Sequence, residues 1–176
     1  MGKAEFIENG SVTSVPGFLA AGVTAGFKKS GAPDFALVYS ETPAAFSGVF
    51  TSCTFAAAPV LLGREKVLKG GTLRAFAINS GNANACTGAQ GLANARKSCE
   101  IAAEKLNVPA SDVVVASTGR IGVQMDMSLI EKGVERRYLA CFCHQQRQRQ
   151  CLYRCPGPCQ RPQKLRDRRS PPGGAC

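Results

Sequence analysis

Short apolar and polar blocks alternate through residues 1–133 and predict strands and helices in turn. The apolar run 35–39 is bounded by turn-forming residues on both sides, which is typical of a buried strand. A second strand is predicted at 73–78, directly after a Lys-Gly-Gly turn. The weaker apolar runs 48–52 and 59–62 indicate further strand or core segments.

The clearest helix follows Thr87, the residue expected to cap it. Pro109 closes this helix, and four consecutive apolar residues at 113–116 then predict a central strand covered on both faces. A shorter helix is predicted from Asp126, as N-cap, to Gly133. The long helix is recognised by apolar residues spaced three and four apart: Leu92, Ala95, Cys99, Ala102, Ala103 and Leu106.

The segment 17–26 is small and glycine-rich, which suits turns or tight backbone packing. The mixture of strands and helices predicts an α+β fold for residues 1–133. A chain of this length is long enough to bury a core.

The character of the chain changes after Gly133. Residues 134–176 carry 10 Lys plus Arg against 2 Asp plus Glu, whereas residues 1–133 carry 12 against 10. The tail also contains six of the nine cysteines and five of the ten prolines, with no sustained apolar period. Such a segment buries too little apolar surface to offset its ordering entropy, so we expect disorder there.

Targeting signals are absent from the pattern. No apolar run approaches the roughly 20 residues of a membrane span, and the first ten residues resemble neither a secretory signal nor a transit peptide. Cys53, Cys86 and Cys99 are scattered, which predicts small buried thiols in a reducing compartment rather than a disulfide framework. The expected location is the cytoplasm, with no membrane partner.

Three groups of segments carry a resemblance, and the decapeptide NSGNANACTG is the most specific of them. In order and spacing they resemble the N-terminal half of the ornithine acetyltransferase (glutamate N-acetyltransferase) family of arginine biosynthesis. The groups are 12–26 with 35–51 and 56–60, then the decapeptide 79–88, then ASTGRIG at 116–122.

The resemblance implies a two-chain enzyme made from one precursor. Members of this family cut themselves into an α and a β chain, and the new N-terminal threonine of the β chain moves acetyl from N-acetylornithine to glutamate. Some members also take acetyl-CoA as donor; no cofactor or metal is implied. The resemblance further implies an α2β2 assembly and a layered αββα-type fold, of which this chain would hold an incomplete part.

By the same resemblance, Thr118 and Gly119 are the oxyanion hole. Attack on an acetyl carbonyl creates a tetrahedral oxyanion that fixed hydrogen-bond donors must stabilise. A tight Ser-Thr-Gly turn after a buried strand is able to aim a hydroxyl and a backbone N–H into a cleft. The alternative is an ordinary turn that ends a strand.

The segment 79–88 also admits two interpretations. It is either a polar loop that shapes the active site, or a strand-to-helix turn built from asparagines and glycines. We favour the turn, since no chemical step falls to a particular asparagine; the substrate-binding residues stay unknown. Cys86 is expected to be a packed thiol, because the only histidine, His144, lies in the tail.

The chain departs from the family pattern in three places. Cys53 stands where an asparagine is common, and Arg120 where an aliphatic residue is usual. After Val134 neither the family's Lys-Gly segment nor its nucleophilic threonine is recognisable. The composition of the tail suggests DNA translated in a wrong frame, so we hypothesise a frameshift near residue 134 and a chain that is inactive alone.

Two other functions compete with this interpretation. The tail has Cys141, Cys143, His144 and further cysteines, which are zinc ligands by type, and arginines that could contact nucleic acid. Their spacing matches no standard zinc motif, so we expect neither a metal site nor specific nucleic-acid binding. The second rival is a non-catalytic α-like partner of a β chain encoded elsewhere.

Overall fold

The structure is a computed structural model that describes residue 8 and residues 10–135. Its centre is a four-stranded sheet in the order β1-β2-β3-β4. The first two pairings are antiparallel, and β3 pairs with β4 in parallel. The strands are β1 (Phe18–Val23), β2 (Phe35–Ala45), β3 (Thr72–Asn79) and β4 (Val113–Ser117).

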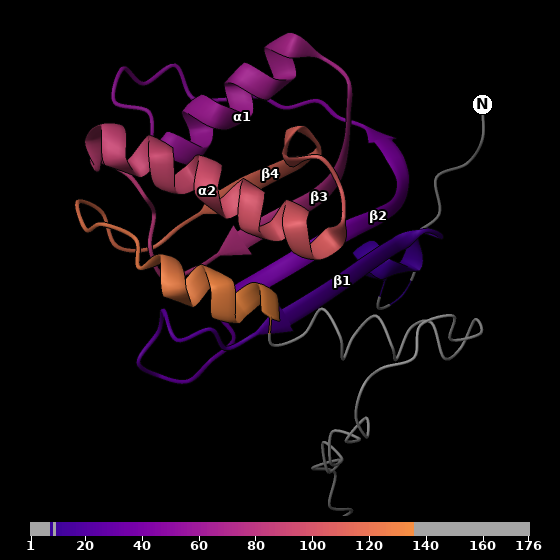
Figure 1. Cartoon of the computed structure of the whole chain (residues 1–176), viewed down its shortest axis with the longest axis horizontal. Helices are drawn as coiled ribbons and strands as arrows, with labels where there is room; N and C mark the ends of the chain where they lie inside the picture. Colours follow the sequence, from indigo (N-terminus) through magenta and orange to yellow (C-terminus); the bar gives the residue numbers. More distant parts are fainter. Residues whose placement is uncertain (1–7, 9, 136–176) are drawn as a thin grey trace, which may run out of the picture.

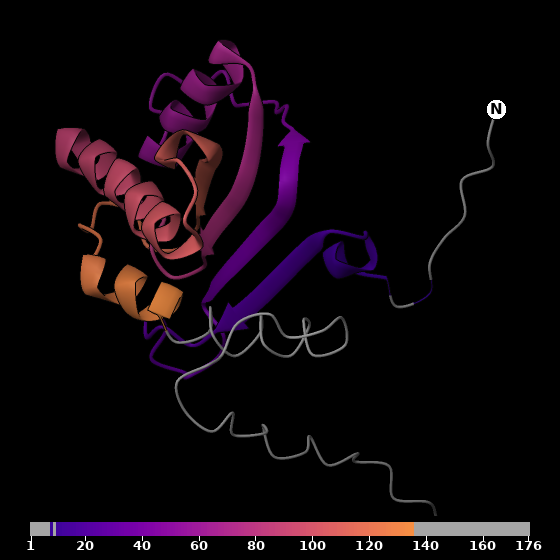
Figure 2. The same ribbon diagram turned by 45° about the vertical axis from the view of Figure 1, so that its right-hand side comes forward.

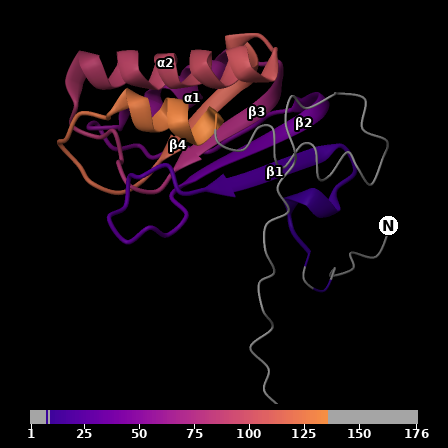
Figure 3. The ribbon, with the colours of Figure 1, turned by 60° about the horizontal axis from the view of Figure 1, so that its bottom comes forward.

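The α-helices all cover one face of this sheet (Figures 1 and 2). Viewed from the side, they form one layer above the strands (Figure 3). They are α1 (Ala58–Lys69), α2 (Gly88–Leu106) and a helix at 127–135. Two short 3-10 turns, η1 (Val12–Ser14) and η2 (Ala110–Asp112), precede β1 and β4. Within the described residues, no helix has the length and apolarity needed to cross a membrane.

Small side chains let the helix layer lie close to the sheet. In β3 the buried positions alternate with half-buried ones, and Ala75 and Ala77 point toward the helices. Ala95 and Ala102 on α2 are almost fully buried against them. The core therefore lies between α2 and the strands β2, β3 and β4.

The opposite face of the sheet carries no helix from the described residues (Figure 3). The pairing register puts Val38, Phe76 and Val114 side by side on that face. These three side chains make the middle of that face apolar, as in a face buried on folding or assembly. The described residues thus form an α+β fold with one helix layer and one sheet layer.

Several predicted elements are confirmed. The strands expected at 35–39 and 73–78 are parts of β2 and β3, and the long helix is α2. Asp126 is the N-cap expected for the last helix, because its carboxylate accepts the backbone N–H of Ser128 at 3.0 Å. That helix passes Gly133, where a side chain would strike the Phe35 ring, so the glycine serves close packing rather than termination.

Two local predictions were wrong, and two were right only in part. The glycine-rich segment includes strand β1. The apolar run 59–62 is a core segment as expected, with Pro59 and Leu62 buried, but it lies in α1 and not in a strand, and Pro59 in the first turn helps to begin that helix. The run 48–52 forms no strand, because Phe50 packs its ring over Gly63 instead of pairing with the sheet. β4 is buried on both faces as expected, but it lies at the edge of the described sheet. The disorder expected for the tail, 134–176, concerns residues that lie outside the described ones from 136 onward.

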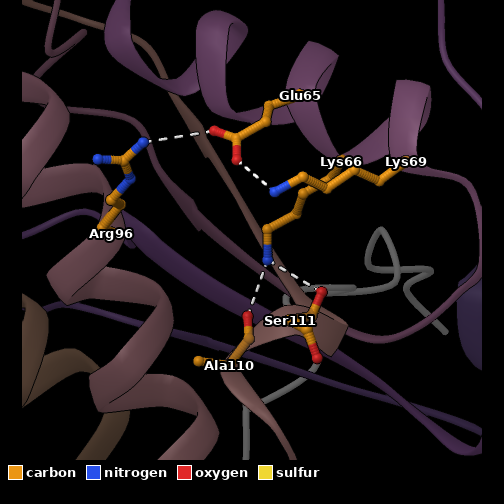
Figure 4. Close-up of polar contacts among 6 residues, drawn as sticks. All are labelled: Glu65, Lys66, Lys69, Arg96, Ala110 and Ser111. Atoms are coloured by element: carbon orange, nitrogen blue, oxygen red, sulfur yellow. Dashed lines mark hydrogen bonds and ion pairs between the residues drawn. The ribbon is translucent and has the colours of Figure 1, made fainter.

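A partly buried lysine ties α1 to the turn that leads into β4 (Figure 4). The Lys66 ammonium donates to the carbonyl oxygens of Ala110 at 2.8 Å and Ser111 at 3.0 Å, and also to that of Val113. Burial lowers the pKa of Lys66, and the three acceptors offset the lost hydration of its charge. The start of β4 is thereby fixed to the helix layer.

Candidate functional site

The predicted Thr118–Gly119 turn directly follows β4, at the same end of the sheet where β3 also ends. Since β3 and β4 are parallel, the loops that leave their carboxyl ends meet at this edge. The loop after β4 continues to pair with the loop after β3 through four backbone hydrogen bonds of 2.8–3.2 Å. They run from Thr118 to Asn79, Arg120 to Gly81, Ala83 to Arg120 and Gly122 to Ala85, donor first.

Because of this pairing, some backbone N–H groups of the turn are bonded to the neighbouring loop and others are left without a partner there. The N–H groups of Thr118, Arg120 and Gly122 are used up against the neighbouring loop. Among the described residues, the Gly119 N–H has no hydrogen-bond acceptor, and neither has the Thr118 hydroxyl. Both residues are exposed. The turn therefore offers one hydroxyl and one N–H to a ligand.

Position 119 requires a glycine for two reasons, its backbone conformation and its close contact with the neighbouring loop. Its φ is +129°, a region that side chains other than glycine rarely adopt. A Cβ at this position would lie 2.4 Å from the carbonyl carbon of Gly81 and 2.8 Å from the nitrogen of Asn82. The two loops touch backbone to backbone here, so the turn has no room for any larger residue.

The asparagines of the decapeptide hold these loops from inside. Asn79 donates from Nδ2 to the Ser117 hydroxyl at 2.8 Å, while its Oδ1 accepts the N–H of Asn82 at 3.0 Å. Asn82 donates from Nδ2 to the carbonyls of Val123 at 3.0 Å and Gln124 at 3.4 Å. Each asparagine thus connects the loop after β3 to the segment around the turn.

Asn84 continues this network toward α2. Its Nδ2 donates to the Gly91 carbonyl at 2.8 Å, and its Oδ1 accepts the Thr87 hydroxyl at 2.8 Å. Thr87 occupies the N-cap position of α2 as predicted, but its side chain makes no capping hydrogen bond. The position of the cap was therefore predicted correctly, but the expected capping hydrogen bond was wrong, because the Thr87 hydroxyl donates to Asn84 instead. These contacts favour the strand-to-helix turn interpretation of 79–88.

Cys53, Cys86 and Arg120 are exposed, whereas Cys99 is buried. Cys86 is exposed with a φ of +56°, so the expectation of a packed thiol there was wrong; Cys53 is exposed as well. Cys99 is buried as expected, and burial raises its pKa to about 11, which makes it a poor nucleophile. Arg120 lies exposed, and its backbone keeps both hydrogen bonds to the neighbouring loop.

Two hollows near the turn are both lined by Ser117, the residue before Thr118, and they differ in what they are able to hold. One has a volume of about 10 Å³ behind Asn79 and Ser117, room for a single water. The other is a groove of about 430 Å³ that reaches Ser117 and is lined mainly by apolar side chains, including Phe46, Val60 and Phe76. Only the groove is large enough for a small organic group. In the part of the chain that the structure describes, no cluster of three or more His, Cys, Asp or Glu could hold a metal.

Two solved structures resemble this fold. The arginine biosynthesis bifunctional protein of Bacillus halodurans superposes with a TM-score of 0.70 at 38% identity, covering 74% of this chain and 68% of that one. The ornithine acetyltransferase of Mycobacterium tuberculosis, solved with ornithine, gives a TM-score of 0.68 at 45% identity and covers 71% and 67%. The fold is therefore that of the ornithine acetyltransferase structures.

The family model described as "ArgJ family" matches residues 19–150, and the chain belongs to that family. Curated relatives agree. The arginine biosynthesis bifunctional protein of Streptomyces avermitilis is 50% identical over 127 residues, and that of Nitratidesulfovibrio vulgaris is 47% identical over 114. The alignment covers 72% of this chain but 33% of the Streptomyces protein, so the chain spans about a third of the length of such relatives.

Proposed function

We propose that this chain is the α-chain part of an acetyltransferase that moves acetyl from N-acetylornithine to glutamate in arginine biosynthesis. The observation that carries the proposal is the exposed Thr118–Gly119 turn, whose hydroxyl and N–H have no hydrogen-bond acceptor among the described residues. Two findings support this reaction. The chain belongs to the ArgJ family, and its fold resembles an ornithine acetyltransferase that was solved with ornithine.

In the proposed mechanism the two donors act on the carbonyl oxygen of the acetyl group. As a nucleophile attacks, negative charge develops on that oxygen, and the Thr118 Oγ1–H and Gly119 N–H stabilise it more than the neutral carbonyl. The donors are held in advance by the loop pairing, so little reorganisation is needed during the reaction. The apolar groove beside Ser117 suits the acetyl methyl or an aliphatic stem.

The attacking hydroxyl belongs, in this proposal, to a threonine on a β chain. A threonine at a new N-terminus is activated by its own amine, which takes the hydroxyl proton. Among the described residues, the one buried thiol is that of Cys99, which has a raised pKa and lies in the core, so it is no substitute. We therefore propose that the 176-residue chain is inactive alone and works in an α2β2 assembly, without cofactor or metal, in the cytoplasm.

Acetyl transfer with and without a β chain tests this proposal. The purified chain should give no turnover with N-acetylornithine and glutamate. Co-expression with a family β chain that begins at the nucleophilic threonine should restore it. Replacing glutamate by water, or N-acetylornithine by acetyl-CoA, in the same assay defines acceptor and donor.

Substitutions at Thr118 test the role of the turn. Thr118→Ala should lower kcat by about 10²–10³-fold, the usual effect of one lost oxyanion donor, while Thr118→Ser, which keeps the hydroxyl, should retain most activity. Turnover by the chain alone would contradict the missing nucleophile. A stable complex without any acetyl transfer would favour the non-catalytic α-like partner instead.

A further inference from the structure

We infer that Asn79 and Asn82 are positioning residues for the Thr118–Gly119 turn, which sets the donors in the direction that the proposed acetyl transfer requires. The inference rests on the proposed function for its chemical meaning. Its structural part, a clamp on the turn by two buried amides, stands on contacts alone.

Asn79 holds the near end of the turn. Asn79 is only 3% exposed, and its side chain joins the loop after β3 to the last residue of β4. Nδ2 donates to the hydroxyl of Ser117, and the main-chain carbonyl of Asn79 accepts the N–H of Thr118 at 3.0 Å. Oδ1 accepts the N–H groups of Gly81 at 3.3 Å and Asn82 at 3.0 Å, which bends its own loop back toward the turn.

Asn82 holds the far end. It is 2% exposed, and its Nδ2 reaches the carbonyls of Val123 and Gln124, beyond the last backbone hydrogen bond of the turn. Its Oδ1 accepts the N–H of Asn84 at 2.7 Å, which prevents the amide from rotating away. The turn is therefore fixed on both sides by side chains that come from one four-residue segment.

The clamp matters because it sets the register of the two loops. Where two segments pair, every second N–H faces the neighbouring segment, so a slip by one residue exchanges the donors that face inward and outward. With the observed register, Thr118 and Arg120 donate inward and Gly119 is left outward. After a slip, Gly119 would point inward and its N–H would be lost to a ligand. The contact between Gly119 and Gly81 allows the observed register to close tightly.

Amide hydrogen exchange on the 176-residue chain tests the clamp without any assay of activity. Asn82→Ala should speed exchange of the Arg120 and Gly122 amides at least tenfold, and leave exchange in α2 at Ala102 unchanged, because only the turn opens. Asn94→Ala is the matched control: it removes a buried asparagine that contacts Gln124 but no residue of 117–122. If Asn79→Ala fails to fold, Asn82→Ala still decides the question.

A kinetic experiment in the co-expressed assembly tests the positioning role. Asn82→Ala should lower kcat at least tenfold with KM for N-acetylornithine changed less than twofold. Its effect should shrink in a Thr118→Ala background, since residues that act through one group are not additive. Unchanged exchange at Arg120 overturns the clamp, and full additivity with Thr118→Ala overturns the positioning role. If the assembly without any substitution is inactive while Asn82→Ala still changes exchange as expected, the proposed function is refuted and the clamp is supported.

Discussion

Asp34 shows how one buried carboxylate shapes a loop that lies against the candidate site, where the Asp34 carbonyl accepts the N–H of Ser80 at 2.8 Å. Its two oxygens accept the backbone N–H groups of Ala25 at 2.6 Å, Gly26 at 3.2 Å and Lys28 at 2.8 Å. Burial by itself would raise the pKa of Asp34, but the hydrogen bonds from the backbone, that of Lys28 foremost, outweigh it and hold the pKa below its ordinary value. The ionised form is therefore favoured by folding.

Stability should consequently depend on pH through Asp34. A carboxylate with a depressed folded pKa contributes its full stabilisation above the unfolded pKa of about 4, and loses it as the pH falls through the folded pKa. Asp34→Asn should lower the free energy of unfolding by about 1–3 kcal/mol at pH 7. Denaturant unfolding of both proteins from pH 7 to 2 measures this. The difference should be constant above pH 5 and shrink below about pH 4; a constant difference at all pH values would contradict it.

Gly119 provides a second test at the residue scale. Gly119→Ala should cost about 2–4 kcal/mol of stability or displace the turn, because its Cβ would collide with the backbone of Gly81. Gly122→Ala is the matched control in the same loop. Its φ is also positive, at +75°, but nothing lies within 4 Å of the new Cβ, so only the backbone strain of about 1–2 kcal/mol remains. Equal losses for the two variants would show that contact with Gly81 is unimportant.

The residue types of the site could be predicted from the sequence, but their partners could not. Thr118 and Gly119 stand in a motif that carries the family resemblance. The roles of Asn79 and Asn82 depend on hydrogen bonds across 38 and 41 positions of the chain, which no local pattern encodes. The exposure of Cys86 follows from a left-handed backbone conformation that cysteine seldom adopts.

At the scale of elements, Lys66 connects α1 to η2 and the start of β4, a contact that no pattern in the sequence predicts. Lys66→Met should lower the free energy of unfolding by about 1–3 kcal/mol, since three carbonyls around η2 lose their donor. Lys69→Met is the matched control on the same helix: it removes only an exposed ion pair with Glu65, worth less than about 0.5 kcal/mol. Chemical denaturation compares the two. A loss for Lys66→Met no greater than that for Lys69→Met would show that the tie to β4 is dispensable.

Elements with a strong period were predictable, and elements decided by tertiary packing were not. α2 has apolar residues that recur every three or four positions, and β3 alternates between buried and half-buried positions, so both were found from the sequence. The run 59–62 is as apolar as a strand, but it begins a helix because Pro59 suits a first turn and Gly63 lets Phe50 pack closely. β1 was missed because its alanines and glycine have little strand preference of their own.

At the scale of the molecule, the sheet has two apolar faces and helices on only one. In the proposed assembly, the β chain covers the second face. Phe76 lies in the middle of that face, next to Val38 and Val114. It also lines two hollows, one of them the groove beside Ser117. An assembly with a β chain should therefore bury it.

A charge placed on this face should separate folding from assembly. Phe76→Asp leaves the helix-side core untouched, because Phe76 points away from α2, so the chain alone should keep its helix content by circular dichroism. The same charge buried against a β chain would be costly, and co-purification with that chain should fall at least tenfold. Lys97→Glu, on the exposed side of α2, is the matched control and should co-purify normally. Normal co-purification of Phe76→Asp would mean that the partner binds elsewhere, because an unpaired carboxylate at the centre of an apolar interface cannot be accommodated without loss.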